Sequence, residues 1–209
     1  MSLKKKILLI FSLLLLVVFL CRVAFQMYVD NLQSFAIERY ELSDSEMIKL
    51  NDKILALNSV EERALFLESM YAIDQEVRAD ETTSIEKYGY DSNEHANALL
   101  KMDSVDAVNL YLAKRYLDTY GYPDVSSFDE TAVYTPLLIF HHQSDFEAYK
   151  KYFHYFYSAY QEGHISAHRL SFSLNRKYMI KFGKQFQTEG KSYTDEEKII
   201  KFIDLLDLH

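Results

Sequence analysis

Ionisable side chains recur at helical spacing in the middle of the chain. Asp74 lies four positions before Arg78, and Asp106 lies three positions before Asn109, so each pair shares a face if its segment is helical. His142 follows in an apolar run and could act as a general acid or base, with an arginine to hold an anion. These residues predict either a hydrolase-like pocket built on His142, Asp74 and Arg78 or a buried polar network that fixes helix register.

Histidines are the second group of side chains that could carry out chemistry. His141 and His142 are adjacent, and His164 lies four positions before His168. A zinc site requires three or four ligands around one point, and two histidines on one helical face could supply part of it. Ser166 is a predicted helix cap, which places His164 outside the helix that holds His168. We therefore expect no metal site and no cofactor, and a histidine metal-binding domain remains an alternative.

Composition excludes several function classes. The sequence has no glycine-rich phosphate loop and no serine elbow. Its 31 acidic and 23 basic residues give a net charge of −8, which repels phosphate backbones, so we expect no nucleic-acid partner. The single cysteine, Cys21, lies in the apolar N-terminal run, so the rest of the chain has no thiol for a disulfide or a nucleophile.

The N-terminal segment has the pattern of a membrane anchor. Three lysines, Lys4 to Lys6, precede an apolar run, and we expect residues 7–28 to cross the membrane. The lysines favour the cytoplasmic side, which predicts a single-pass protein of the cell membrane with its C-terminal body outside the cytoplasm. The domain boundaries are then 1–30 for this signal-anchor and 31–209 for the body. Cleavage of the segment and lipidation of Cys21 remain open, although the small residues that either requires are not in place.

The body has the composition and the helix starts of an all-α protein. It is rich in apolar residues, and the whole chain has only five Gly and two Pro. Ser or Thr is followed three positions later by Glu, the pattern of a helix N-terminal capping box, in five places: Ser43 with Glu46, Ser59 with Glu62, Ser127 with Glu130, Ser144 with Glu147, and Thr194 with Glu197. These signals predict a single compact multi-helix domain after one N-terminal transmembrane helix.

Residues that begin or end helices, and the spacing of apolar residues, predict individual elements of the body. Residues 80–93 are polar and end near a glycine, which predicts a surface loop. Thr135 and Pro136 are typical of the cap and first position of a short helix that continues to His142. A buried helical stripe is expected at spacings of three to five, formed by Leu65, Met70, Ile73 and Val77.

Several short motifs follow one another between residues 65 and 190. They are Asp74-Gln75 with Arg78, Asn109 before Gly121-Tyr122-Pro123, His141-His142, Gly163-His164-Ile165, Asn175-Arg176, and a final segment around Gln185. In order and spacing this set resembles the bacterial family known as domain of unknown function 6624, which carries D-Q-x-x-R, G-W-P, Q-H, G-E-I, D-R and Q-x-Y-G-T-Q. The resemblance implies a helical fold and no established chemistry. Within these motifs and beside them, the ligand-binding candidates are Gln75, Asp106, Asn109, Arg176 and Gln185.

The sequence therefore favours a non-catalytic binding or interaction module whose partner is a protein, a peptide or an envelope component. The hydrolase-like enzyme is the main alternative. The two differ in the environment that they require for the polar set: a binding module can bury it with its charges mutually satisfied, whereas an enzyme should open it into a cleft.

Overall fold

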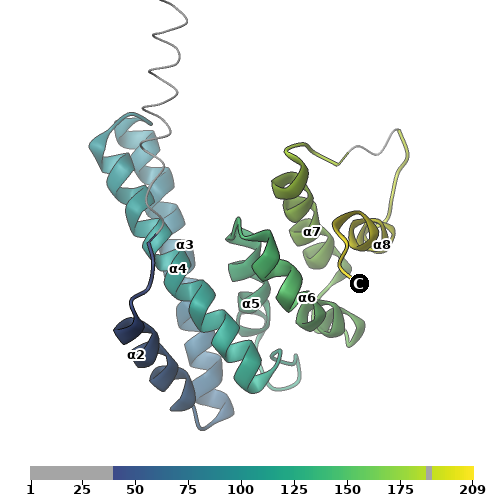
Figure 1. Cartoon of the computed structure of the whole chain (residues 1–209), viewed down its shortest axis with the longest axis horizontal. Helices are drawn as coiled ribbons and strands as arrows, with labels where there is room; N and C mark the ends of the chain where they lie inside the picture. Colours follow the sequence, from purple (N-terminus) through teal and green to yellow (C-terminus); the bar gives the residue numbers. More distant parts are fainter. Residues whose placement is uncertain (1–39, 187–189) are drawn as a thin grey trace, which may run out of the picture. The chain divides into compact units, whose positions relative to one another are not determined.

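The computed structural model describes residues 40–186 and 190–209, which form seven α-helices and no strand (Figure 1). The helices are α2 (Asp44–Leu55), α3 (Val60–Tyr88), α4 (Asn93–Tyr120), α5 (Glu130–His142), α6 (Phe146–Gln161), α7 (Ala167–Phe182) and α8 (Asp195–Leu206). The predicted all-α class is confirmed for these residues. From Tyr40 to His209 the chain forms one compact unit.

The predicted membrane segment, residues 1–30, lies outside the described residues, as does the beginning of the predicted body. Among the helices that the structure does describe, none is both long enough and apolar enough to cross a membrane.

Side-chain caps explain where the helices begin. Three predicted capping boxes are confirmed, at the starts of α2, α3 and α8. The other two predictions were wrong, because α5 is capped by Asp129 and α6 by Asp145, whose carboxylates accept the backbone N–H groups of Ala132 and Ala148. An aspartate is as good a cap as serine, and the aspartate nearer each helix takes the position.

The loop predicted for residues 80–93 is also wrong, because α3 continues to Tyr88 and the turn is short. Gly89 ends α3 with a positive φ of 85°, and the Ser92 side chain caps α4 by accepting the His95 backbone N–H. The buried His95 ring lies 3.3 Å from the Ser84 hydroxyl. Packing of α3 against α4 therefore extends the helix through residues of modest helix propensity.

Helix α5 contains the proline that was expected to start it. Pro136 lies in the middle of Glu130–His142 and is buried. The predicted helix start at Thr135 is wrong, and the Thr135 hydroxyl instead donates to the carbonyl of Thr131, one turn earlier. Since a proline lacks the N–H that would bond one turn back, the helix loses one hydrogen bond, and the packing of its buried residues compensates for that loss.

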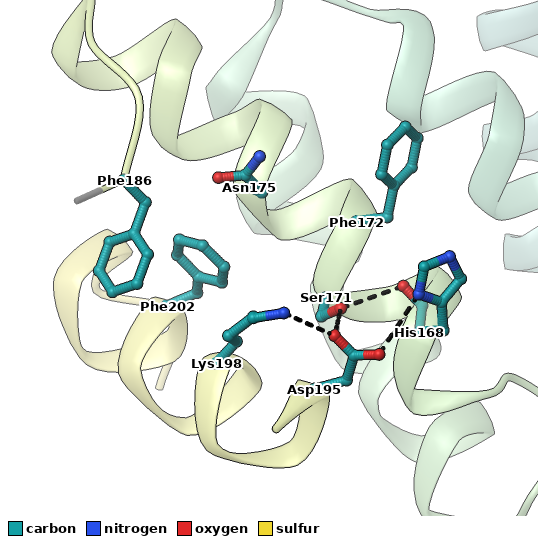
Figure 2. A pocket seen from close by; sticks show the side chains of 8 residues that line it. All are labelled: His168, Ser171, Phe172, Asn175, Phe186, Asp195, Lys198 and Phe202. Carbon is teal, nitrogen blue, oxygen red and sulfur yellow. Dashed lines mark hydrogen bonds and ion pairs between the residues drawn. The ribbon is translucent and has the colours of Figure 1, made fainter. Parts of the chain in front are cut away.

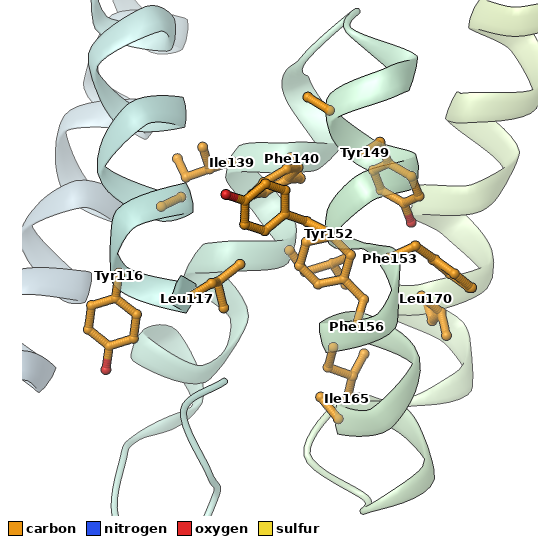
Figure 3. Packing of buried hydrophobic residues seen from close by; sticks show 14 of the residues in the cluster. Tyr116, Leu117, Ile139, Phe140, Tyr149, Tyr152, Phe153, Phe156, Ile165 and Leu170 are labelled. Carbon is orange, nitrogen blue, oxygen red and sulfur yellow. The ribbon is translucent and has the colours of Figure 1, made fainter. Parts of the chain in front are cut away.

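Aromatic rings dominate the core. Phe140 of α5 packs against Tyr152 and Phe156 of α6, with ring centroids 5.2 and 5.1 Å apart (Figure 3). The stripe predicted on α3 is only half correct: Met70 and Val77 are buried, whereas Leu65 and Ile73 are 65% and 46% exposed. The buried face of α3 also includes Asp74, so one carboxylate is turned into the interior beside the apolar core.

Candidate functional site

A network of charged side chains joins α3, α4 and α5. Asp74 is completely buried, and its Oδ1 lies 3.0 Å from Nη2 of Arg78, one helical turn further along α3. The same Nη2 lies 2.7 Å from Oδ1 of Asp106 on α4. The Arg78 side chain is 24% exposed, and its Nη1 lies 3.2 Å from the sulfur of Met102. One guanidinium therefore bridges two carboxylates that belong to different helices.

His142 completes the network from the last position of α5. Its Nδ1 lies 3.0 Å from Oδ1 of Asp74 and 2.8 Å from Nε of Arg78. The two contacts require opposite roles of this nitrogen, because Nδ1 must carry a proton to donate to Asp74 and must lack one to accept from Arg78. A change of His142 tautomer or charge therefore exchanges one interhelical hydrogen bond for the other.

Burial and charge act differently on the two carboxylates. Burial alone would raise the pKa of Asp74, but the hydrogen bonds and charges of His142 and Arg78 outweigh it and hold this pKa below its usual value. Burial raises the pKa of Asp106, and the positive charge of Arg78 only partly opposes that shift. Asp74 is therefore the anionic centre of the network.

Only one of the other candidate residues from the sequence belongs to this network. Gln75 belongs to it, because its side-chain amide donates to Oδ2 of Asp74 over 2.8 Å. Asn109 is buried on α4 and lines a different hollow, between α2, α3 and α4, and its Nδ2 has no hydrogen-bond partner among the described residues. Gln185 is exposed after the end of α7. The charges of Arg78 and Asp106 shift the pKa of Arg176 on α7 in opposite directions. Among the described residues, Arg176 forms no hydrogen bond with either of them.

A hollow of about 340 Å³ lies where the end of α5 meets α7, and we call it the α5–α7 hollow. It is lined by His141, Phe172, Asn175, Arg176, Met179 and Ile180. His141 is buried, and burial lowers the pKa of its imidazole to about 3, so the ring is neutral at physiological pH. The four residues that form the charge network do not line this hollow.

A buried lysine, Lys177 of α7, binds the C-terminal end of α5. The Nζ of Lys177 donates to the carbonyls of His141, over 3.3 Å, and Gln143, and it lies 5.0 Å from the ring centroid of Tyr149. These carbonyls lie at the C-terminal end of the helix, which favours a nearby cation. Gln143 also donates from its side chain to the backbone carbonyl of Asp106 and so ties this helix end to α4.

A second pocket, of about 220 Å³, separates α7 from α8 and contains serine, histidine and aspartate (Figure 2). The Ser171 hydroxyl lies 2.9 Å from Oδ1 of Asp195, and Nδ1 of His168 lies 3.3 Å from Oδ2 of the same carboxylate. Lys198 also binds Asp195. A catalytic triad requires the imidazole to lie between the hydroxyl and the carboxylate, and here the carboxylate lies in the middle. This arrangement ties α8 to α7 without activating the hydroxyl.

Sequence reasoning missed Lys177 and Gln143. Helical periodicity could have indicated Lys177, because it falls on the buried face of α7 with Leu170, Leu174 and Tyr178. The Gln143 contacts depend on how helix ends meet and have no local signal.

Metal binding finds no support in residues 40–186 and 190–209, where no group of three or more His, Cys, Asp or Glu side chains could hold an ion. His164 and His168 point to different acidic partners, Glu162 and Asp195, each 3.3 Å away. Comparison of the chain with protein-family models, with curated proteins and with solved structures found no match.

Proposed function

We propose that this chain is a non-catalytic binding module, held at the cell membrane by residues 7–28 with its helical body outside the cytoplasm. In this proposal its partner is a protein, a peptide or an envelope component. The resemblance to the domain of unknown function 6624 family belongs to the same proposal, with the charge network as a shared folding element.

The observation that carries the proposal is that the charged groups of the network are paired with one another inside the fold. Asp74 is completely buried and is contacted by Gln75, Arg78 and His142. Nη2 of Arg78 is bonded to both Asp74 and Asp106, and the two carboxylates offset the charge that a substrate anion would need. Groups that neutralise one another inside the fold hold the register of α3, α4 and α5, whereas an active site keeps its groups directed at a cleft.

A hydrolase-like enzyme remains the second candidate because His142 lies next to the buried carboxylate of Asp74. A carboxylate that orients an imidazole is the arrangement of a general base. In that alternative, His142 would act from its Nε2 while Asp74 fixes the ring.

Paired substitutions separate the two candidates. The purified full chain is assayed with p-nitrophenyl esters and p-nitrophenyl phosphate, alongside His142→Gln and Asp74→Asn. We expect no turnover above that of the variants, and Asp74→Asn should lower the free energy of unfolding by on the order of 2–3 kcal/mol because it breaks a buried ion pair. Glu130→Gln, which breaks an exposed pair with Arg169, should cost less than about 1 kcal/mol.

Turnover that is lost in His142→Gln and kept in His154→Gln would favour the enzyme. His154 is an exposed histidine on α6 and serves as the matched control. The stability measurement is made by urea denaturation followed by circular dichroism, since the chain has no tryptophan.

A further inference from the structure

The α5–α7 hollow has one apolar wall and one positive group. Five of its lining residues lie on α7 at positions 172, 175, 176, 179 and 180, which is one helical face. The Phe172 ring stacks on the His141 ring with centroids 4.8 Å apart and an angle of 15° between the planes. Phe172 and Met179 are 53% and 40% exposed, so the wall is open to a ligand.

Arg176 is the cation of this hollow. No carboxylate of the described residues forms an ion pair or a hydrogen bond with its guanidinium, although acidic residues outnumber basic ones in the whole chain. Partial burial and the neighbouring charge of Arg78 lower the pKa of Arg176, while Asp106 opposes that shift. Arg78 is bonded to Asp74 and Asp106 and does not line the hollow, whereas Arg176 lines it and has no hydrogen bond or ion pair within residues 40–186 and 190–209.

Basic side chains also lie near His141. After burial, the groups that lower the pKa of this imidazole are His142, Arg176, Lys177 and Arg78. His141 is only 7% exposed, and its Nδ1 has no hydrogen-bond partner in the part of the chain that the structure describes. A guanidinium that no described carboxylate pairs with can attract a small anion in an acidic protein, because the remaining surface repels such anions.

We propose that the α5–α7 hollow binds a small carboxylate that carries an apolar, preferably aromatic, body. The carboxylate is held by the Arg176 guanidinium, whose planar donors match the two oxygens. The apolar body lies against Phe172, Met179 and Ile180. The volume of about 340 Å³ is at the lower end of the range for small-molecule sites, which limits the ligand to a compact molecule.

This inference rests on the proposed binding function and gives it a ligand class. The probe is phenylacetate, and phenylacetamide is the matched neutral probe because it keeps the ring and the shape but lacks the charge. Both are titrated into the purified full chain by isothermal calorimetry. We expect phenylacetate to bind with a dissociation constant tighter than about 10 mM and phenylacetamide to bind at least about ten-fold more weakly, because the charged hydrogen bonds are lost.

Two arginine variants localise the binding. Arg176→Gln should weaken phenylacetate at least about ten-fold and leave phenylacetamide unchanged. Arg169→Gln is the matched control, since Arg169 lies on the same helix but pairs with Glu130 and stacks on Tyr134, and it should leave both probes unchanged. Phe172→Ala should weaken both probes because it removes the exposed ring of the wall.

Three results would overturn the inference: equal binding of the two probes, unchanged phenylacetate binding in Arg176→Gln, or no binding of phenylacetate below about 10 mM. Circular dichroism confirms that each variant is folded. Failure of the ligand class is distinguishable from failure of the proposed function, because the latter is detected by turnover that depends on His142.

Discussion

Lys177 is fully buried, and its ammonium group lies among backbone carbonyls and the Tyr149 ring, with no ion pair to a carboxylate of residues 40–186 and 190–209. Burial lowers its pKa to about 7, and the charge of Arg176 adds to the shift, while Asp145 opposes it. Hydrogen bonds to carbonyls do not need a full charge, because a neutral amine still donates two protons. The residue can therefore close α5 in either protonation state.

Stability should consequently rise with pH. Between the folded pKa of about 7 and the ordinary lysine value of 10.5, the unfolded chain binds a proton that the folded chain does not. The free energy of unfolding then increases from pH 7.5 to 9 by at most about 1.4 kcal/mol per pH unit. Urea denaturation at several pH values measures this slope. Lys177→Met should remove the rise in the free energy of unfolding with pH. An equal rise in Lys177→Met would show that another group causes it. A flat profile in the wild type would show that the pKa of Lys177 is not lowered.

At the scale of the helices, the caps decide where α5 begins. Asp129→Ala should lower the free energy of unfolding by about 1 kcal/mol, because the Ala132 backbone N–H loses its acceptor. Ser127→Ala, at the position that the capping-box pattern selected, should cost less than about 0.5 kcal/mol because its side chain does not cap the helix. Thermal and urea denaturation of both variants test the boundary. A larger loss in Ser127→Ala would place the cap at the serine.

Some helix boundaries are determined by local sequence and others by packing. Helix class and the starts of α2, α3 and α8 follow from caps and composition, because those interactions span only a few residues. The extension of α3 through 80–88 and the proline inside α5 depend on tertiary packing, which overrides local propensity.

The contacts of the candidate site likewise depend partly on local spacing and partly on how the helices pack. The pairing of Asp74 with Arg78 follows from a spacing of four residues on one helix, and the structure confirms it. The contact of His142 with Asp74 joins residues 68 positions apart, and the position of Arg176 in a separate hollow depends on how α7 packs beside α5. No spacing rule determines either position. The fold joins His142 to Asp74 and Arg78, as the sequence grouping expected, but it places Arg176 apart from them.

For the whole molecule, the distribution of charge and apolar residues underlies the expected location. Of the chain's 23 basic residues, Lys4, Lys5 and Lys6 stand together before the long apolar run that ends at Cys21. Such a cluster is held on the cytoplasmic side, so the helical body is expected on the other side. Ligands of the α5–α7 hollow would then come from outside the cytoplasm.

Cysteine labelling tests that location, because the chain has only Cys21 and a Cys21→Ser background has no thiol. Ile200 on α8 is 63% exposed, so Ile200→Cys places a reactive thiol on the body. In intact bacterial spheroplasts, a membrane-impermeant maleimide should label Ile200→Cys before lysis, whereas Ser2→Cys beside the lysines should react only after lysis. Labelling of both sites only after lysis would place the body inside the cell and overturn the anchored arrangement, because an exposed thiol on a body outside the membrane should react with the reagent before lysis.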